Sequence, residues 1–210
     1  MIMDIKLDRH PLVFIGHGHE FDEKIVAFSQ EASIIYAFTD ERIVDPHVSV
    51  VSGKFEDGIE TVRDVRPIIT FISTEDEVLD AQLASMASLY STMVYIPDRV
   101  MLSDINLCAL IKKGPVSIGI STKGKSPAMT VMIKKRLNAC IDKYGIITRE
   151  DALMIDFISR NRTKIISGIR DRRRRRVMMY KIAVDRNMRS MVASGTGDPD
   201  KMLESLIDGQ

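Results

Sequence analysis

A glycine-rich turn lies near the start of the chain, where Gly16-His17-Gly18-His19 separates an apolar run from a helical pattern. Glycines at such a turn let backbone N–H groups and the first turn of the helix approach a pyrophosphate. Asp40 closes the next apolar run, roughly 20 residues further on, where a carboxylate can accept hydrogen bonds from a ribose. The pattern indicates a dinucleotide site. A tight turn without a ligand explains it equally well, because Phe21 replaces the third glycine and Glu20 would repel a phosphate.

A second cluster of polar residues lies in the middle of the chain, at Ser121-Thr122-Lys123-Gly124-Lys125-Ser126. Hydroxyl and ammonium donors are concentrated there just before a predicted helix, whose positive end favours carboxylates or phosphates. The spacing is not that of a Walker loop. We expect an anion-binding loop, and a capped surface turn is the alternative.

A single carboxylate, Asp98, follows Pro97 at the end of another apolar run. Ligands of open parallel sheets bind at the carboxyl ends of the strands. A carboxylate at that place can act as a general base, although many such aspartates are only turn residues.

Composition and charge exclude several classes of protein. The net charge is +1, and the consecutive arginines Arg172–Arg176 would point all around a helix, so we expect no nucleic-acid partner. His17 and His19 match no zinc-ligand spacing, and we expect no metal. Two cysteines and the lack of an apolar leader or a long apolar run indicate a cytoplasmic protein outside the membrane.

Strands and helices are predicted to alternate in the first half of the chain, which is typical of an α/β fold with a parallel sheet. We expect strands at 11–16, 33–38, 48–51, 67–72 and 92–96, with helices at 20–31 and 78–87. A strand at 116–121 and a helix from Ser126–Pro127 to Gly145 come next, and the chain is predicted to be all-helical from Thr148.

The middle of the chain, GPVSIGISTKGKSPAM at 114–129, resembles the signature of the sirohaem synthase family, the precorrin-2 dehydrogenases with or without ferrochelatase activity. Two further segments are similar to the family, Phe71–Val78 and Met93–Asp98, and the latter places Asp98 on the family's catalytic aspartate. The resemblance extends in order over nearly the whole chain, including the arginine-rich tail.

The resemblance implies a Rossmann-like NAD-binding domain at 1–112, a central dimerisation segment at 113–145 and a small helical domain at 146–210. It implies a homodimer that oxidises precorrin-2 to sirohydrochlorin with NAD, and some members also insert ferrous iron. The family's roles then fall on Asp98 for catalysis, on Gly16, Gly18, His19, Glu20, Thr39, Asp40 and Thr74 for NAD, and on Ser121, Thr122, Lys123, Gly124, Lys125 and Ser126 for the tetrapyrrole.

The first loop departs from the family pattern GGGxVAxRK, because this chain has GHGHEFDEK at 16–24. An alternative is therefore a non-catalytic member that binds a tetrapyrrole or another pathway enzyme, such as glutamyl-tRNA reductase. Asp104 competes with Asp98 for the catalytic role, although it could instead cap a following helix.

Overall fold

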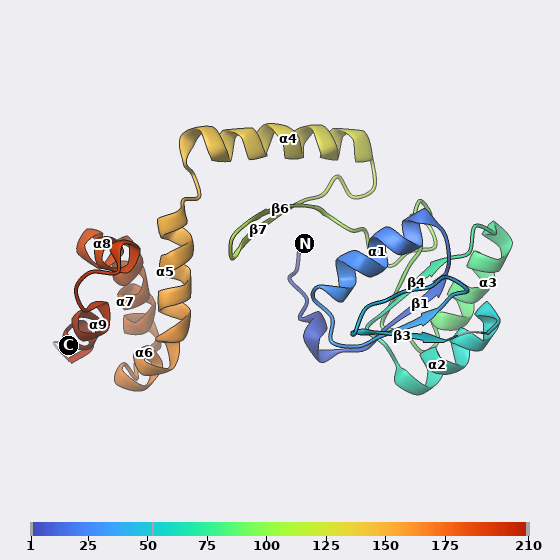
Figure 1. The fold of residues 1–210 in the computed structure, drawn as a ribbon, viewed down its shortest axis with the longest axis horizontal. Coiled ribbons are helices and arrows are strands. Elements are labelled where there is room, and N and C mark those ends of the chain that lie inside the picture. Colours follow the sequence, from blue (N-terminus) through green and yellow to red (C-terminus); the bar gives the residue numbers. More distant parts are fainter. Residues whose placement is uncertain (1, 52, 209–210) are drawn as a thin grey trace. The chain divides into compact units, whose positions relative to one another are not determined.

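The computed structural model describes residues 2–51 and 53–208, and the chain divides into two compact units (Figure 1). The sheet unit comprises the residues up to Leu107 together with Lys123–Lys125. The helical unit comprises Cys108–Thr122 and the residues from Ser126 onward. Each unit is described by itself below.

The sheet unit contains a five-stranded parallel sheet with strand order β3-β2-β1-β4-β5, so the predicted α/β class is confirmed. The strands are β1 (Leu12–Gly16), β2 (Ile35–Phe38), β3 (Val48–Val51), β4 (Ile69–Ser73) and β5 (Met93–Tyr95). Every residue of the central strand β1 is buried, as its unbroken apolar run predicts for a strand covered on both faces.

Helices cover both faces of this sheet (Figure 1). On one face α1 (His19–Ser29) packs Phe21 and Ile25 against Phe14 and Phe71, whose rings stack 4.8 Å apart between centroids. On the other face α2 (Gly58–Val65) and α3 (Glu77–Ala87) pack on Val13, Ile15 and Ile72. Short 3-10 turns at Leu7–Arg9 and Phe55–Asp57 complete the unit.

The helix α2 was missing from the sequence-based expectation. It is only eight residues long, and just Gly58, Ile59 and Val62 are buried in it. Gly58 lies directly on the sheet, since a Cβ atom there would come within 2.8 Å of Ile15 Cδ1. The apolar pattern of this segment is too short to predict a helix without knowledge of the sheet surface that the helix covers.

The helical unit starts with an antiparallel hairpin, β6 (Ala109–Lys113) and β7 (Val116–Ile120), followed by the long helix α4 (Pro127–Tyr144). Ser126 caps α4 through the N–H of Met129 at 3.3 Å, and Gly145 ends it with φ +57°, as predicted. Lys112 and Lys113 pair with Ser117 and Val116, so the hairpin turn is confined to Gly114 and Pro115.

Five helices form the rest of this unit, as the all-helical expectation predicted (Figure 1). They are α5 (Arg149–Arg160), α6 (Arg162–Gly168), α7 (Arg172–Val184), α8 (Arg186–Ser194) and α9 (Pro199–Asp208). Their shared core contains Met154, Phe157, Ile165, Ile182 and Leu203. None of the helices in the described part of the chain has the length and apolar character needed to cross a membrane.

Candidate active site

The glycine turn joins β1 to α1 at the carboxyl edge of the sheet. Gly16 has φ +140°, and a Cβ atom on it would lie 1.8 Å from the carbonyl oxygen of Ser73, so no other residue fits beside β4. Gly18 has φ +88° and precedes α1. Its N–H donates a hydrogen bond to Glu41 Oε1 at 2.8 Å. The turn is therefore closed by a carboxylate from the segment after β2.

Glu41, rather than Asp40, is the carboxylate that reaches the glycine turn. Asp40 is exposed, whereas the Glu41 N–H donates to the hydroxyl of the buried Thr39 at 3.2 Å. The Gly18 N–H and a hydrogen bond from Asp22 lower the pKa of Glu41. The same contact raises the pKa of Asp22.

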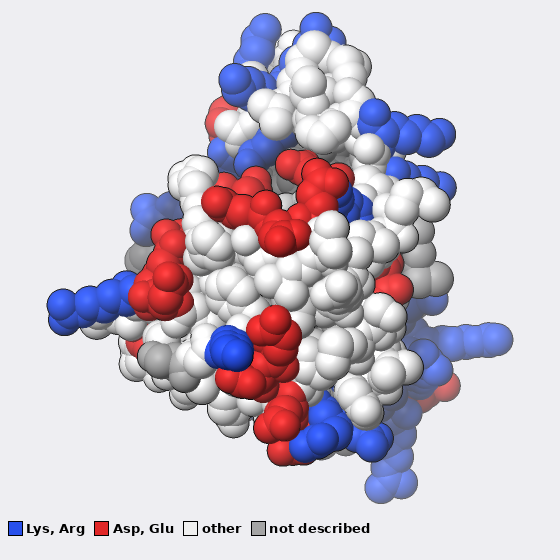
Figure 2. Space-filling model, turned by 90° about the vertical axis from the view of Figure 1, so that its right-hand side faces the viewer, with Lys and Arg blue, Asp and Glu red and all other residues white. Residues whose placement is uncertain are grey.

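Several carboxylates lie at this turn, and their negative charges would oppose the binding of an anion. Glu75 lies against Gly18, since a Cβ atom on Gly18 would be 2.5 Å from Glu75 Oε1. Glu20, beside His19 in the exposed first turn of α1, forms an ion pair with Lys24 at 3.7 Å. The sheet unit as a whole has 19 Asp and Glu against 10 Lys and Arg. Figure 2 shows acidic side chains gathered in several clusters on the face that lies on the α3 side of Figure 1.

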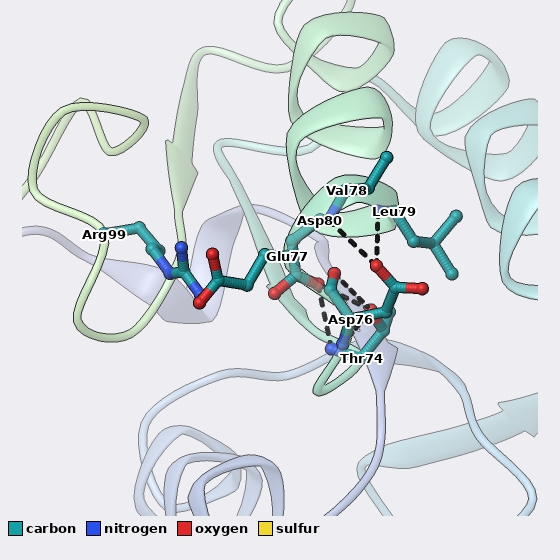
Figure 3. Close-up of polar contacts among 7 residues, drawn as sticks. All are labelled: Thr74, Asp76, Glu77, Val78, Leu79, Asp80 and Arg99. Atoms are coloured by element: carbon teal, nitrogen blue, oxygen red, sulfur yellow. Dashed lines mark hydrogen bonds and ion pairs between the residues drawn. The ribbon is translucent and has the colours of Figure 1, made fainter.

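Thr74 lies in the loop between β4 and α3, and its polar groups are already engaged (Figure 3). Its N–H and its hydroxyl donate to Asp80 Oδ1, at 2.9 and 2.8 Å, and both residues are buried. Asp76 caps α3 through the N–H groups of Val78 and Leu79. The buried Asp80 thus holds the loop between β4 and α3 in place. The Thr74 hydroxyl donates its hydrogen bond to Asp80 and so helps to hold this loop.

Asp98 lies in a tight turn after β5, in which the Arg99 N–H returns to the carbonyl of Ile96 at 3.3 Å. Its φ is +57°, a left-handed conformation that aspartate and asparagine tolerate better than most residues. The side chain is exposed. Burial, together with the negative charges of Glu20 and Asp98, raises the pKa of Tyr95 to about 12.

Asp104, the competitor for the catalytic role, has a structural task. Its carboxylate accepts the Val94 N–H at 2.8 Å, and its own N–H donates to the Val94 carbonyl at 2.9 Å. The expectation that it caps a following helix was wrong, because the extended β6 follows. Asp104 instead satisfies the backbone groups on the free edge of β5.

The predicted anion-binding loop is divided between the two units. Lys123, Gly124 and Lys125 are exposed and belong to the sheet unit, where Gly124 packs against Val100. Ser121, Thr122 and Ser126 belong to the helical unit. There the hydroxyl of Thr122 accepts the Ser126 N–H at 3.2 Å and contacts the Thr130 hydroxyl at 3.0 Å.

Comparison with known proteins matches the central part of the chain to a family model. Residues 113–139 match the model described as "Sirohaem biosynthesis protein central". A siroheme synthase of Hydrogenovibrio crunogenus is 23% identical over 97% of this chain and 43% of its own length. A siroheme synthase of Psychrobacter cryohalolentis is 33% identical over 42% of this chain and 17% of its own length. The chain thus spans less than half the length of these curated relatives.

A solved structure extends the likeness to the whole chain. It is described as "SirC, precorrin-2 dehydrogenase", with 17% identity, a TM-score of 0.66 and full coverage of both chains. The chain is thus similar to the sirohaem synthase family in its central segment and to the SirC structure in its fold. The parallel sheet followed by a helical part, described above, matches the fold of that structure.

The NAD that the family implies can be compared with the residues at its loop. Gly16 is buried beside β4 and the Gly18 N–H already donates to Glu41, but the Glu41 carboxylate just after β2 suits the hydroxyls of a ribose. Glu20 and Glu75 oppose the negative charge of a pyrophosphate. The residues therefore fit the adenosine end of NAD, and we expect the affinity to be low.

Sequence reasoning missed two residues of this site. Glu41 stands next to Asp40 in the sequence, and no local pattern tells which of the two turns toward Gly18. Tyr95 was assigned only to a strand, although its ring packs against Phe71 at 5.6 Å and its hydroxyl is close enough to Asp98 to be affected by its charge. An aromatic residue with a polar group at a strand's carboxyl end was the available signal.

Proposed function

We propose that this chain oxidises precorrin-2 to sirohydrochlorin in sirohaem biosynthesis, with NAD as the hydride acceptor and Asp98 as the acceptor of a ring proton. The match of residues 113–139 to the sirohaem biosynthesis model, the similarity to siroheme synthases and the full-length likeness to the SirC fold support this proposal. The observation that carries it is the exposed carboxylate of Asp98 in a fixed turn at the carboxyl edge of the sheet.

The reaction removes hydrogen from the macrocycle both as hydride and as protons. NAD supplies the hydride acceptor when it is bound. The protons need a base, and the two candidate carboxylates differ in their surroundings. Both side chains are exposed, but Asp104 accepts the Val94 N–H of β5 at 2.8 Å and is held there, whereas Asp98 lies in the turn after β5. A carboxylate placed beside a bound substrate can accept a proton from it.

Only a few backbone and side-chain groups of this chain would contact NAD. The backbone at Gly16 and Gly18 would lie along the dinucleotide, and Glu41 would accept hydrogen bonds from the adenosine ribose. Lys123 and Lys125, exposed beside Gly124, would meet the carboxylates of the tetrapyrrole. Insertion of ferrous iron, which some family members catalyse, would also need a base for the ring N–H protons, and Asp98 could fill that role.

A second candidate is a member of the family that binds a tetrapyrrole, or another enzyme of the pathway, without using NAD. The contact between Gly18 and Glu41 favours it, together with the Glu75 carboxylate that lies against Gly18. In this alternative the helix end that would face the pyrophosphate is occupied by the protein's own carboxylates.

An anaerobic assay distinguishes the two candidates. The full chain is mixed with precorrin-2, with and without NAD, and sirohydrochlorin and NADH are followed by absorbance. NAD-dependent formation of both products is the expected result. If the tetrapyrrole binds but neither product forms with NAD or NADP, the second candidate replaces the first. A parallel sample with sirohydrochlorin and ferrous ion tests iron insertion.

A further inference from the structure

The loop that carries Asp98 continues into three apolar residues at the surface, Val100, Met101 and Leu102. Their exposed fractions are 48%, 95% and 40%. Leaving apolar side chains together in water forgoes the free energy that burial would provide. Three such neighbours at one loop tip, next to a candidate catalytic carboxylate, form a small apolar surface that is available for contact.

The loop is held firmly at its base, so its tip is presented in a defined place. Arg99 Nη2 lies 2.5 Å from Glu77 Oε1, which ties the loop to the first turn of α3 (Figure 3). The Ser103 hydroxyl accepts the Ile96 N–H and donates to the Ile96 carbonyl, both at 2.9 Å. Asp104 adds its two hydrogen bonds to Val94.

Cations lie beside the same tip. Gly124 has φ +73°, and a Cβ atom on it would lie 3.2 Å from Val100 Cγ2 and 3.1 Å from Asn106 Oδ1. This close approach brings the exposed residues Lys123 and Lys125, on either side of Gly124, next to Val100. All of these residues belong to the sheet unit. The loop that carries Asp98 and the segment that carries the two lysines thus meet at Val100 and Gly124.

We propose that Val100–Met101–Leu102 is the surface on which the face of the tetrapyrrole macrocycle rests, with Met101 as its main contact. The proposal rests on the proposed function. A tetrapyrrole of this pathway has a flat, largely apolar ring system with carboxylates around its edge. The apolar tip matches the ring, and the two lysines match the carboxylates. Met101 is thereby a positioning residue that places the macrocycle against Asp98.

The proposal is tested by titrating the full chain with sirohydrochlorin under anaerobic conditions, followed by the change in its visible absorption. Met101→Ser removes the apolar side chain, and Met101→Leu retains it. Leu89→Ser is the matched control, because Leu89 is 73% exposed and follows the other end of α3. We expect Met101→Ser to raise Kd about tenfold or more, as loss of an apolar anchor does, with Met101→Leu and Leu89→Ser close to wild type.

Equal affinity of wild type and Met101→Ser would overturn the proposal while leaving the proposed function intact. Wild type that binds no tetrapyrrole would instead remove the proposed function and this inference together. Sedimentation of the same variants tests whether a second copy of this chain, instead of the tetrapyrrole, binds to this apolar surface. If Met101→Ser changes the oligomeric state and leaves Kd unchanged, the tip is an interface between copies and the proposal is wrong.

Discussion

The carboxylate of Glu41 accepts a hydrogen bond from the backbone N–H of Gly18 over 2.8 Å, across the gap between the ends of β2 and β1. This contact joins the glycine turn after β1 to the segment after β2, the two places where nucleotide-binding parallel sheets contact their ligand. It also puts a negative charge at the start of α1, where the helix dipole stabilises it.

The first prediction concerns Glu41. Glu41→Gln keeps an acceptor for the Gly18 N–H but removes the charge that would bind the ribose. Hydrogen bonds to a charged group contribute about 1.5–3 kcal/mol, so we expect the affinity for NAD to fall about tenfold or more. Calorimetric titration with NAD measures this. Tighter binding by Glu41→Gln would mean that Glu41 blocks the site, and would favour the member that does not use NAD.

The second prediction concerns Glu20, in the first turn of α1. Glu20→Val removes a negative charge near the expected pyrophosphate, and we expect NAD to bind severalfold more tightly. Glu23→Val is the control, because Glu23 is also exposed and also pairs with Lys24, at 3.8 Å, but lies further along the helix. Equal gains from both substitutions would show a general effect of net charge and not one at this loop.

The third prediction separates Asp98 from Asp104. Asp98→Asn removes the carboxylate but tolerates the φ of +57°, so the folded state should be unaffected. We expect turnover of precorrin-2 to fall by on the order of a hundredfold or more, the usual scale for loss of a general base.

Asp104→Ala should have the opposite profile. It leaves the Val94 N–H without its carboxylate partner, which should lower the free energy of unfolding by about 1 kcal/mol while the folded protein keeps its turnover. Thermal unfolding and the anaerobic assay, applied to both variants, measure the two effects. Full activity of Asp98→Asn would remove Asp98 from the mechanism.

The fourth prediction concerns pH and the start of α5. Asp151 accepts the N–H and hydroxyl of Thr148, at 2.8 and 2.7 Å, and Arg189 Nη2 at 2.7 Å. The two Thr148 groups, followed by Arg189, lower the pKa of Asp151 to about 2. Because the pKa is lower in the folded state, this stabilisation is present above the ordinary value of 3.8 and is lost as the pH falls through about 2.

Asp151→Asn should therefore lower the free energy of unfolding by about 1 kcal/mol at pH 7, the usual contribution of a helix cap. The difference from wild type should shrink between pH 4 and pH 2. Thermal unfolding followed by circular dichroism at several pH values measures it. Glu150→Gln is the control, since Glu150 lies 3.8 Å from Arg189 but takes no part in the cap. A difference that is constant over this pH range would contradict the assignment.

The fifth prediction is a homodimer through the hairpin β6–β7 and α4. A two-stranded hairpin and one helix bury little by themselves, and Met129, Val131 and Ile133 remain exposed on α4. Ile133→Lys should shift the chain from dimer to monomer in sedimentation velocity at micromolar concentration. Val26→Lys, an equally drastic change on the exposed side of α1, should leave the dimer intact. A monomeric wild type would remove the prediction.

The sequence by itself determined the order and type of most elements, because these depend on local patterns. The apolar runs of β1 and β4 predicted buried strands, and Ser126, Gly145 and Thr148 marked helix ends through interactions within a few residues. The motif at 114–129 pointed to the family without any coordinates. The choice of Asp98 as a candidate base likewise needed only its place after a strand.

The tertiary structure alone decided what depends on contacts between distant residues. It decided that Glu41 and not Asp40 meets Gly18, 23 positions away, because side-chain direction at the end of β2 follows from the twist and packing of the sheet. It decided that Asp104 holds β5 through the backbone of Val94. Val94 lies on a strand at the edge of the sheet, and no local sequence pattern tells which strand lies at an edge. It also brought Gly124 onto Val100, so that the segment with Lys123 and Lys125 lies beside apolar residues that are distant in the sequence.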